Sequence, residues 1–381
     1  MTRSAPGVSS ENGVTTGGSS QKLRKRFTAL LRPQAIVRCM RIMIVTDAWF
    51  PQTNGVVHTL AQTAAWLGRF GHEVRLITPQ DFRTFPCPTY PEIRIAWFPY
   101  RQVAQTIGAF QPHAIHIATE GSLGFAARRY CIVNDLKFTT SYHTQFPQYL
   151  KERYPIPLWA SYAALTWFHN AAERCMVSTK SVHEQLAQRG FKSLARWQRG
   201  VDTTIFRPYD KAFLDLPRPI AAYVGRVAVE KNIDAFLRMP WKGSKIVVGD
   251  GPELPRLKQQ YPDAVYAGYK FGEELARHVA ASDVFVFPSV TDTFGLVNLE
   301  AMACGVPVAA FPVTGPIDVV EDGVTGALDD DLAAAALRAL KISPEACRER
   351  ALRSGWDACT RQFEANLAFS EPHESTVMVP S

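Results

Sequence analysis

The stretch from Pro288 to Pro307 (PSVTDTFGLVNLEAMACGVP) constrains the fold more than any other part of the sequence. The apolar run Asp283 to Phe287 precedes it and predicts a buried strand, and LVNLEAMA within it predicts a helix. A turn at Cys304-Gly305 then leads into VPVAAF, which predicts a second strand. Strand–loop–helix–strand units build parallel sheets with helices on their faces, so the sequence predicts an α/β fold.

Two acidic residues lie in this unit where a parallel sheet binds its ligands. Asp292 is in the loop after the strand, and Glu300 lies about one turn into the helix. Loops at the carboxyl ends of parallel strands line the ligand crevice, and helix N-termini there attract phosphate. An anion site beside two carboxylates that can accept hydrogen bonds from hydroxyl groups favours a nucleotide-sugar as the ligand.

The composition is that of a globular chain long enough for two domains. Of the 381 residues, 46% are hydrophobic and 20% are charged. Seven scattered cysteines form no Cys-x-x-Cys pair and no His-spaced cluster, which favours a reduced cytoplasmic protein without a metal site. No apolar run reaches the roughly 18 residues that span a bilayer, so we expect any membrane contact to be peripheral.

The formal net charge of +7 is unevenly distributed. Residues 1–40 carry seven Lys and Arg against one acid, residues 41–200 carry 17 against nine, and residues 201–381 carry 18 against 25. A basic half joined to an acidic half indicates that the two halves meet different partners. No basic–aromatic or helix-turn-helix pattern favours nucleic acid, whereas clustered Lys and Arg each add about 1 kcal/mol of attraction to an anionic membrane.

Residues 1–39 have two equally open interpretations. The first twenty are rich in Ser, Gly and Thr and are expected to be disordered, and Gln21 to Val37 is basic and could lie on a membrane as a short amphipathic helix. Because Met40 immediately precedes the first predicted strand, the whole segment could instead be an extension from a misread start. A cleaved signal peptide is disfavoured, because no sufficiently long apolar region follows the charges.

The first half alternates predicted strands and helices. Arg41 to Thr46 and Glu73 to Thr78 predict strands, and the helix between them ends at Arg69. The Asn54-Gly55 turn lies where a loop meets that helix, and its glycine lets the backbone approach a ligand, although a simple tight turn explains it as well. His143 just follows a later predicted strand, near the crevice rim, where a lone histidine is usually structural.

Residues 153–174 hold five aromatic side chains at helical spacing, with charges only at the ends. Aromatic stripes of this kind are more often core than membrane anchor, so we predict that these side chains are buried. The five are Tyr154, Trp159, Tyr162, Trp167 and Phe168.

The second half restarts the alternation after a polar, proline-bearing linker from Asp202 to Pro219. Two successive predicted strands end in the glycine-bearing turns Val224-Gly225-Arg226 and Val248-Gly249-Asp250-Gly251. Arg226 and Lys231 flank the first turn, and a planar guanidinium beside a mobile ammonium suits a diphosphate. Ordinary surface charge is the alternative explanation.

The acidic run Asp329 to Asp331 is not interpreted as a metal site. It precedes the predicted helix LAAAALRAL, where acidic residues at the N-terminus cap the helix and interact favourably with its dipole. Farther on, Ser343 to Phe369 predicts one or two helices with Trp356 and Phe363 on the apolar face.

With these pieces in place, the chain resembles glycosyltransferase family 4, which comprises retaining enzymes of GT-B architecture, from about Met40 to Phe363. The Asp292–Glu300 stretch is similar to the family's E-x7-E signature, and VGRVAVEKN, VGDGPE, RGVDTTIF and the NGV turn match in order. The resemblance implies two Rossmann-like doubly wound domains facing across a cleft. The expected parts are a disordered basic extension at 1–39, an acceptor domain at 40–205, a donor domain at 206–345, a C-terminal helix at 346–368 packing back toward the first domain, and a frayed tail at 369–381.

The resemblance also implies a role for each matched position. Arg226 and Lys231 would hold the donor diphosphate and stabilise the leaving group. Asp292 would hold hydroxyls of the donor sugar, and because the family has Glu here, the shorter carboxylate affects which sugar is held. Glu300 would accept hydrogen bonds from the ribose, and His143 would reach toward the donor sugar. The remaining expected donor-binding residues are Asn54, Gly55, Gly225, Gly249, Asp250, Gly251, Phe294, Gly295 and Leu296.

The implied activity is hexosyl transfer from a UDP- or GDP-sugar, without a cofactor or metal. PHAIHIATEGSLGFAAR and SYHTQFPQYLKERYP are similar to the branch of mannosyltransferases and glycolipid synthases that act on phosphatidylinositol or diacylglycerol. We therefore expect a lipid acceptor, an α-glycosidic product, and a monomer or weak dimer on the inner face of the cytoplasmic membrane. The alternatives are a soluble mannosyl- or glucosyltransferase of polysaccharide or small-solute synthesis, and a catalytically silent sugar-nucleotide-binding protein.

Overall fold

The computed structural model describes residues 39–52, 54–87, 90–145 and 157–370. The predicted amphipathic segment Gln21 to Val37 and the aromatic residue Tyr154 lie outside the described residues. From Met40 onward the chain forms one unit that contains both predicted halves.

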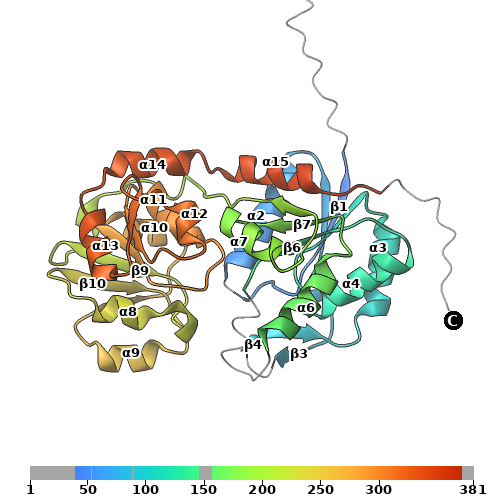
Figure 1. Cartoon of the computed structure of the whole chain (residues 1–381), viewed down its shortest axis with the longest axis horizontal. Coiled ribbons are helices and arrows are strands. Elements are labelled where there is room, and N and C mark those ends of the chain that lie inside the picture. The colour runs from blue at the N-terminus through green and yellow to red at the C-terminus, as the bar shows by residue number, and fades with distance from the viewer. Residues whose placement is uncertain (1–38, 53, 88–89, 146–156, 371–381) are drawn as a thin grey trace, which may run out of the picture. The chain divides into compact units, whose positions relative to one another are not determined.

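A six-stranded parallel sheet in the order β2-β1-β5-β6-β7-β8 organises the first half (Figure 1). A separate antiparallel pair, β3 with β4, follows β2 in the chain. The strands are β1 (Arg41–Val45), β2 (Glu73–Ile77), β3 (Thr84–Cys87), β4 (Tyr90–Ala96), β5 (Ala114–Ile117), β6 (Thr139–Tyr142), β7 (Arg174–Val177) and β8 (Leu194–Arg196). The helices are α2 (Gly55–Arg69), α3 (Tyr100–Phe110), α4 (Ser122–Val133), α6 (Leu158–His169) and α7 (Lys180–Ala187), and Pro79–Asp81 forms a short 3-10 turn.

Both faces of this sheet are covered, because successive side chains of a strand point to opposite faces. Met43 and Val45 of β1 pack in one core with residues of α3 and α4. Ile42 and Ile44 pack in another core with residues of α2. The apolar run that predicts this strand is thus apolar on both sides, as a central parallel strand requires.

The second half contains a parallel sheet in the order β11-β10-β9-β12-β13-β14, the doubly wound order of a Rossmann fold. Its strands are β9 (Ile220–Val224), β10 (Ser244–Val248), β11 (Val265–Gly268), β12 (Val284–Phe287), β13 (Val308–Ala310) and β14 (Gly326–Leu328). Its helices are α8 (Ile233–Arg238), α9 (Leu254–Gln260), α10 (Gly272–Ala280), α11 (Leu296–Ala303), α12 (Pro316–Val319) and α13 (Leu332–Ala339), with 3-10 turns at Lys211–Phe213 and Val229–Lys231.

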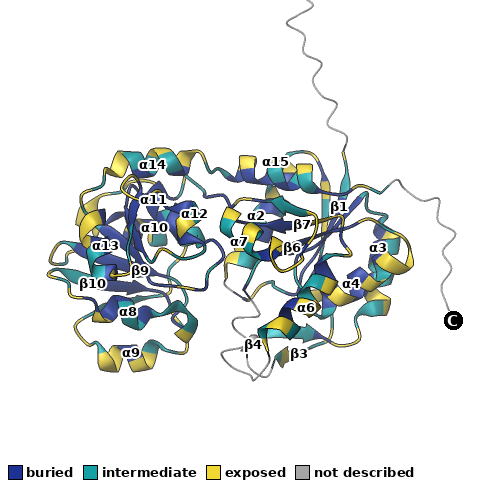
Figure 2. Cartoon of the chain, viewed as in Figure 1, coloured by how far each residue is buried: buried dark blue, intermediate teal, exposed yellow. Residues whose placement is uncertain are grey.

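The core of the second half has the same two-faced arrangement. Ile220, Ala222 and Val224 of β9 pack in a cluster with residues of α10 and α11. Ala221 and Tyr223 pack in a second cluster with residues of α8 and α13. Figure 2 shows the strands of both sheets mostly buried, with exposed residues on the outer faces of the helices. Two Rossmann-like halves confirm the predicted α/β class.

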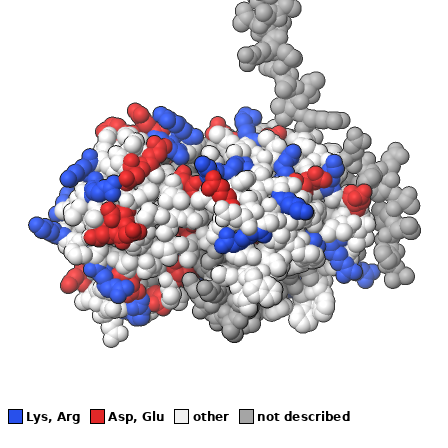
Figure 3. Space-filling view, viewed as in Figure 1, with Lys and Arg blue, Asp and Glu red and all other residues white. Residues whose placement is uncertain are grey.

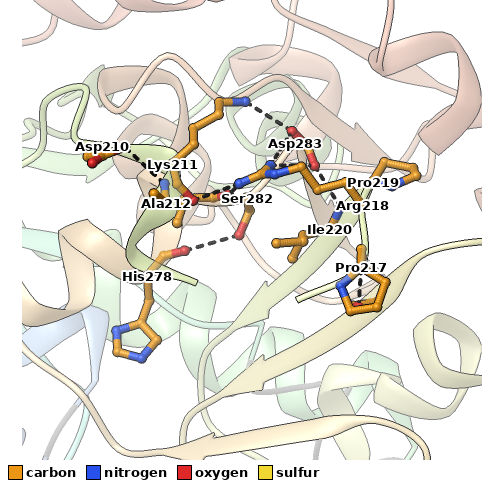
Figure 4. A network of polar contacts seen from close by, with 12 residues as sticks. Asp210, Lys211, Ala212, Pro217, Arg218, Pro219, Ile220, His278, Ser282 and Asp283 are labelled. Atoms are coloured by element: carbon orange, nitrogen blue, oxygen red, sulfur yellow. Dashed lines mark hydrogen bonds and ion pairs between the residues drawn. The ribbon is translucent and has the colours of Figure 1, made fainter. Parts of the chain in front are cut away.

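Asp283 fastens the linker to the start of the second sheet (Figure 4). Its carboxylate accepts hydrogen bonds from Nη1 of Arg218, at 2.7 and 2.8 Å, and from the backbone N–H of Ile220, at 2.7 Å. Nζ of Lys211 also lies 3.1 Å from this carboxylate. The predicted strand therefore begins one residue later, at Val284, because Asp283 joins the linker to β9 instead of continuing the apolar run.

The C-terminal segment forms two helices, α14 (Pro344–Leu352) and α15 (Trp356–Asn366), which pack on different halves. Cys347 of α14 is buried in the core that contains α11. Trp356 and Phe363 of α15 are 3% and 0% exposed and lie in the core of β1 and α2, which confirms the predicted apolar face. Next to these helices the N–H of Val201 donates to the Ser354 carbonyl at 2.9 Å.

The prediction that the aromatic residues of 153–174 are all buried is wrong for two of them. Tyr162 and Phe168 are buried, but Trp159 is 75% exposed and Trp167 is 58% exposed. The helix α6 has apolar residues all round its axis, so its sequence does not indicate which face is covered. By contrast, Asp331 caps α13 by accepting hydrogen bonds from Ala333 and Ala334, which supports capping as the role of that acid.

Candidate active site

Most predicted site residues of the second half follow β9 and β12, which are neighbours at the point where the strand order of the sheet reverses, and Gly249, Asp250 and Gly251 follow β10. Loops diverge at such a point and leave room for a ligand between them. Two hydrogen bonds join these loops: Nδ2 of Asn232 donates to the Pro288 carbonyl at 3.1 Å, and Oγ1 of Thr291 donates to the Glu230 carbonyl at 3.3 Å.

The glycines of the two turns let the loops after β9 and β10 touch. Gly225 and Gly249 have φ angles of +150° and +149°, which favour glycine. A Cβ on Gly249 would lie 1.9 Å from the carbonyl oxygen of Gly225, and a Cβ on Gly251 would lie 2.3 Å from that of Val227. These glycines are therefore required by the packing of the turns themselves, whatever else they contact.

Lys231 and Asp292 meet at the centre of this loop pair. The Nζ atom of Lys231 lies 2.7 and 2.8 Å from the two carboxylate oxygens of Asp292. Nη1 of Arg226 lies 3.9 Å from a carboxylate oxygen of Glu230, and the Arg226 carbonyl accepts a hydrogen bond from Tyr223 at 2.8 Å. The structure thus brings Lys231 and the loop acid together, and it places Arg226 in the same loop as Lys231, beside Glu230.

Gly295 begins α11 with a left-handed conformation, at a φ of +77°. A Cβ there would lie 2.6 Å from Nδ2 of Asn298 and 2.9 Å from Cζ of Phe287. No side chain caps this helix, and of its first-turn N–H groups that of Asn298 donates to the Gly295 carbonyl, which leaves those of Leu296 and Val297 for an anion at the loop. The Phe294 side chain is buried in the core and can contribute only backbone groups.

Glu300 and Asp250 differ from this central pair in their surroundings. Burial raises the pKa of Glu300 to about 7 from an ordinary 4.5. A carboxyl group poised at this pKa changes charge in the physiological range. The Asp250 carboxylate accepts a hydrogen bond from its neighbour Gly251 at 2.7 Å, so its described contact is local to its own turn.

The predicted glycine turn of the first half lies against α11. Asn54 caps α2 by accepting hydrogen bonds from Val56 and Val57, both at 3.0 Å. A Cβ on Gly55 would lie 3.3 Å from Cδ1 of Leu296, a close approach that leaves little room for a larger residue. The structure therefore brings the first turns of α2 and α11, from opposite halves, together.

His143 is held by Arg199, the first residue of the RGVDTTIF segment, to which the sequence analysis assigned no role. Nη2 of Arg199 lies 3.1 Å from Nδ1 of His143, and Arg199 is only 5% exposed. A guanidinium can only donate hydrogen bonds, so Nδ1 is the acceptor and the ring proton is on Nε2. Burial, followed by the charge of Arg199, holds the pKa of His143 well below its ordinary 6.5. His143 is therefore a neutral ring whose Nε2–H is the donor.

Thr293, the residue after Asp292, joins the loop to the first half. Its Oγ1 donates to the His143 carbonyl at 2.7 Å. Its own carbonyl accepts hydrogen bonds from the hydroxyls of Ser178, at 3.1 Å, and Thr179, at 3.2 Å. The position of the Asp292 loop is thus tied to the strand ends that carry His143. Nothing local in the sequence indicates this contact, because the partners are separated by 150 and about 115 positions.

Together these groups can hold an anion with attached hydroxyl groups. Two cations and a helix N-terminus suit a diphosphate, and the carboxylates and the neutral imidazole suit hydroxyls. Within the described part of the chain, no group of three or more His, Cys, Asp or Glu residues is placed to hold a metal ion.

Comparison with known proteins identifies the family. Residues 53–205 match the model of glycosyltransferase family 4, and residues 218–342 match that of glycosyl transferases group 1. The chain is 31% identical over 324 residues to a GDP-mannose-dependent alpha-mannosyltransferase of Mycobacterium tuberculosis, covering 76% of this chain and 83% of the relative. It is 28% identical over 353 residues to an alpha-monoglucosyldiacylglycerol synthase of Streptococcus pneumoniae, covering 80% and 79%.

The fold is also similar to that of solved glycosyltransferase structures. Anabaena HepE, crystallised in complex with UDP-glucose, superposes with a TM-score of 0.66 at 16% identity, over 86% of this chain and 98% of that one. The paired parallel sheets, the loop chemistry and the matching relatives agree. The chain belongs to glycosyltransferase family 4 and is a glycosyltransferase of the GT-B fold.

Proposed function

We propose that this enzyme transfers a hexosyl unit from a UDP- or GDP-sugar to a lipid acceptor of the phosphatidylinositol or diacylglycerol type, with an α-glycosidic product. The observation that carries the proposal is the pairing of Lys231 with Asp292 beside Arg226 and the first turn of α11. The relatives support the substrate classes, because one uses GDP-mannose and another makes a glucosyldiacylglycerol.

The donor diphosphate would lie on Arg226, Lys231 and the first-turn N–H groups of α11. Negative charge develops on the departing nucleotide diphosphate, and positioned cations and N–H groups stabilise that charge most in the transition state. Asp292 would then accept hydrogen bonds from the hexose hydroxyls, and Glu300 from the ribose. The Lys231–Asp292 contact would place the sugar at a set distance from the diphosphate.

We propose that the sugar keeps its anomeric configuration because the acceptor hydroxyl attacks the anomeric carbon from the face that the diphosphate leaves. A double displacement requires a carboxylate nucleophile on the opposite face of the sugar. Asp292 is paired with Lys231, which lies on the proposed diphosphate side. We therefore propose that the leaving phosphate takes the acceptor proton, and that transfer needs no metal ion.

The positive charge of the first half supports the proposal of a lipid acceptor at a membrane. The first half is basic, with 17 Lys and Arg against nine acids in residues 41–200, which suits an anionic membrane surface. No described helix is long and apolar enough to cross a bilayer. We propose a peripheral enzyme at the inner face of the cytoplasmic membrane.

The test is a matrix of UDP- and GDP-sugars against vesicles containing phosphatidylinositol or diacylglycerol, with products identified by mass spectrometry and their anomeric configuration by NMR. We expect an α-hexosyl lipid from one nucleotide class, unchanged by EDTA. Arg226→Ala should lower kcat/KM by about 100-fold, as the loss of a transition-state charge contact does. Arg277→Ala, which removes a surface ion pair on α10, should leave it unchanged.

Other outcomes would overturn the proposal. A product only with soluble sugars or polyols would favour a polysaccharide or small-solute enzyme, and no transfer to any acceptor would favour a silent binding protein. A β-linked product would exclude retention.

A further inference from the structure

One face of α6 exposes a stripe of apolar side chains to solvent. Trp159, Ala163 and Trp167 lie four residues apart, so they share one side of the helix. All three are exposed, and the two indoles are 75% and 58% exposed. Large aromatic side chains at this exposure are costly in water, and two on one stripe form a patch rather than a scattered surface residue.

The stripe continues onto α4. Phe125, 47% exposed, stacks on Trp167 with ring centroids 6.2 Å apart and planes at 25°. Beside the stripe is an open groove of about 900 Å³, lined by Leu158, Trp159, Tyr162, Thr166, Trp167 and Arg189 among others. We call the set Phe125, Trp159, Ala163 and Trp167 the α6 aromatic surface.

Cations border this surface. The guanidinium of Arg128 lies 3.7 Å from the Trp167 ring centroid, and that of Arg189 lies 4.4 Å from the Tyr162 ring centroid. Neither α4 nor α6 contains an Asp or Glu residue. In Figure 3 the lower part of the first half shows mostly uncharged surface, with blue side chains above it.

We propose that the α6 aromatic surface docks on the interface of an anionic lipid bilayer. Indole rings favour the headgroup region, where their apolar body is buried and their N–H remains hydrated. The exposed Arg189 at the border would meet lipid phosphates, whereas Arg128 is buried and donates hydrogen bonds to the carbonyls of Trp167 and Phe168. The 12 residues of α6 are too few to span a bilayer, so the helix lies along the surface.

The charge pattern favours a membrane over a second copy of this chain. Opposing two copies of the same surface would bring the exposed Arg189 toward its own counterpart, without acids on α4 or α6 to compensate. An anionic bilayer supplies the missing negative charge. The inference deepens the proposed function, because a lipid acceptor has to be reached at a membrane, but docking itself requires no catalysis.

The experiment measures flotation of the full chain with vesicles of phosphatidylcholine alone or with 30% phosphatidylglycerol in roughly physiological salt. We expect binding to the anionic vesicles. The double variant Trp159→Ala/Trp167→Ala should bind at least about tenfold more weakly, because two side chains lose part of their burial. The control Phe271→Ala removes an equally prominent aromatic, 72% exposed, from the second half and should bind as the wild type does.

A second readout locates the contact. Brominated lipid should quench the tryptophan fluorescence of the wild type, and this quenching should fall in the double variant. Melting temperature and nucleotide affinity should not change, because both side chains are on the surface. Equal binding by wild type and double variant, or an equal loss in Phe271→Ala, overturns the proposal.

Light scattering, which measures the oligomeric state, tests whether a second copy of the chain occupies the α6 aromatic surface. A wild-type dimer that becomes a monomer in the double variant would show that a second copy covers the surface, and the membrane proposal would fall. Loss of hexosyl transfer to every acceptor with vesicle binding intact would instead sink the proposed function and leave the docking surface standing.

Discussion

Nζ of Lys231 lies 2.7 Å from Oδ1 of Asp292, which joins a residue of the first turn after β9 to the acid in the loop after β12. The two side chains are 22% and 20% exposed, so the pair is half-buried and accessible to a ligand. A sugar held by Asp292 and a phosphate held by Lys231 would therefore be fixed relative to one another.

Two replacements of Asp292 should distinguish the effect of its negative charge from the effect of its side-chain length. Asp292→Asn leaves Lys231 without this carboxylate, and we expect kcat/KM to fall by about 100-fold with every donor. Asp292→Glu keeps the charge and adds a methylene, so we expect activity to persist with a changed order of preference among hexoses. Steady-state kinetics over a donor panel measure both, and Asp329→Asn at the surface is the control. An unchanged preference in Asp292→Glu would contradict a sugar-holding role.

Replacing Arg199 should alter the pH dependence through His143. The charge of Arg199 disfavours the imidazolium, so Arg199→Gln should raise the pKa of His143 toward its ordinary 6.5. The acid limb of kcat/KM should then move to higher pH, because the ring must stay neutral to donate from Nε2 alone. The control is Arg174→Gln, which removes contacts to the carbonyls of Asn366 and Leu367. A lower rate with the same acid limb would show only a structural role for Arg199.

Once ionised, Glu300 should lower the stability of the folded chain and strengthen donor binding. Its pKa is about 7 in the folded chain against 4.5 ordinarily, so the native state binds this proton more tightly than the unfolded state. Stability from the protonated form is therefore present below about pH 4.5 and lost as the pH rises toward 7. Glu300→Gln stays neutral, so its unfolding free energy relative to wild type should gain about 1–3 kcal/mol between pH 4.5 and pH 8. Urea denaturation at both pH values measures this gain, while donor affinity at pH 8 should fall. If the difference in unfolding free energy between Glu300→Gln and the wild type did not change with pH, burial would not raise the pKa of Glu300.

Asp283 should matter for stability and not for transfer. Asp283→Asn removes charge-assisted bonds to Arg218 and Lys211, and we expect a loss of about 1–2 kcal/mol in unfolding free energy. The exposed acid Asp263, changed to Asn, is the matched control and should be neutral. Chemical denaturation measures the difference, and a large fall in kcat at 25 °C would show that the linker clamp acts on the site.

The structure contains the predicted strands and turns because the sequence patterns that indicate them lie within a few consecutive residues. The run before Pro288 forms β12, and the LVNLEAMA run forms α11 with Gly295 at its start. The structure brings Lys231 and Asp292 together and places Arg226 in the loop after β9 that also carries Lys231, although the chemical roles of all three remain predictions. Residue spacing and the rules of parallel sheets were sufficient for this much.

What could not be predicted depends on contacts between distant segments. Thr293 meets His143 across 150 positions, and Arg199 meets His143 across 56, and neither pair has a local pattern. Trp159 and Trp167 were assigned to the core because a helix that is apolar all round gives no polar face to mark its exposed side. Those indoles are exposed because no neighbouring element of the described chain covers their side of α6. The periodicity of the helix sequence does not encode which side is covered.

The packing of α15 has a consequence for synthesis of the protein. Trp356 and Phe363 complete a core whose other members include Ile42 and Ile44, at the opposite end of the chain. In a nascent chain, α2 can cover only part of this face of the first sheet until α15 has left the ribosomal exit tunnel, although the rest of that half has long been translated. The first half, although it is translated first, can therefore complete this core only after nearly the whole described chain has been synthesised.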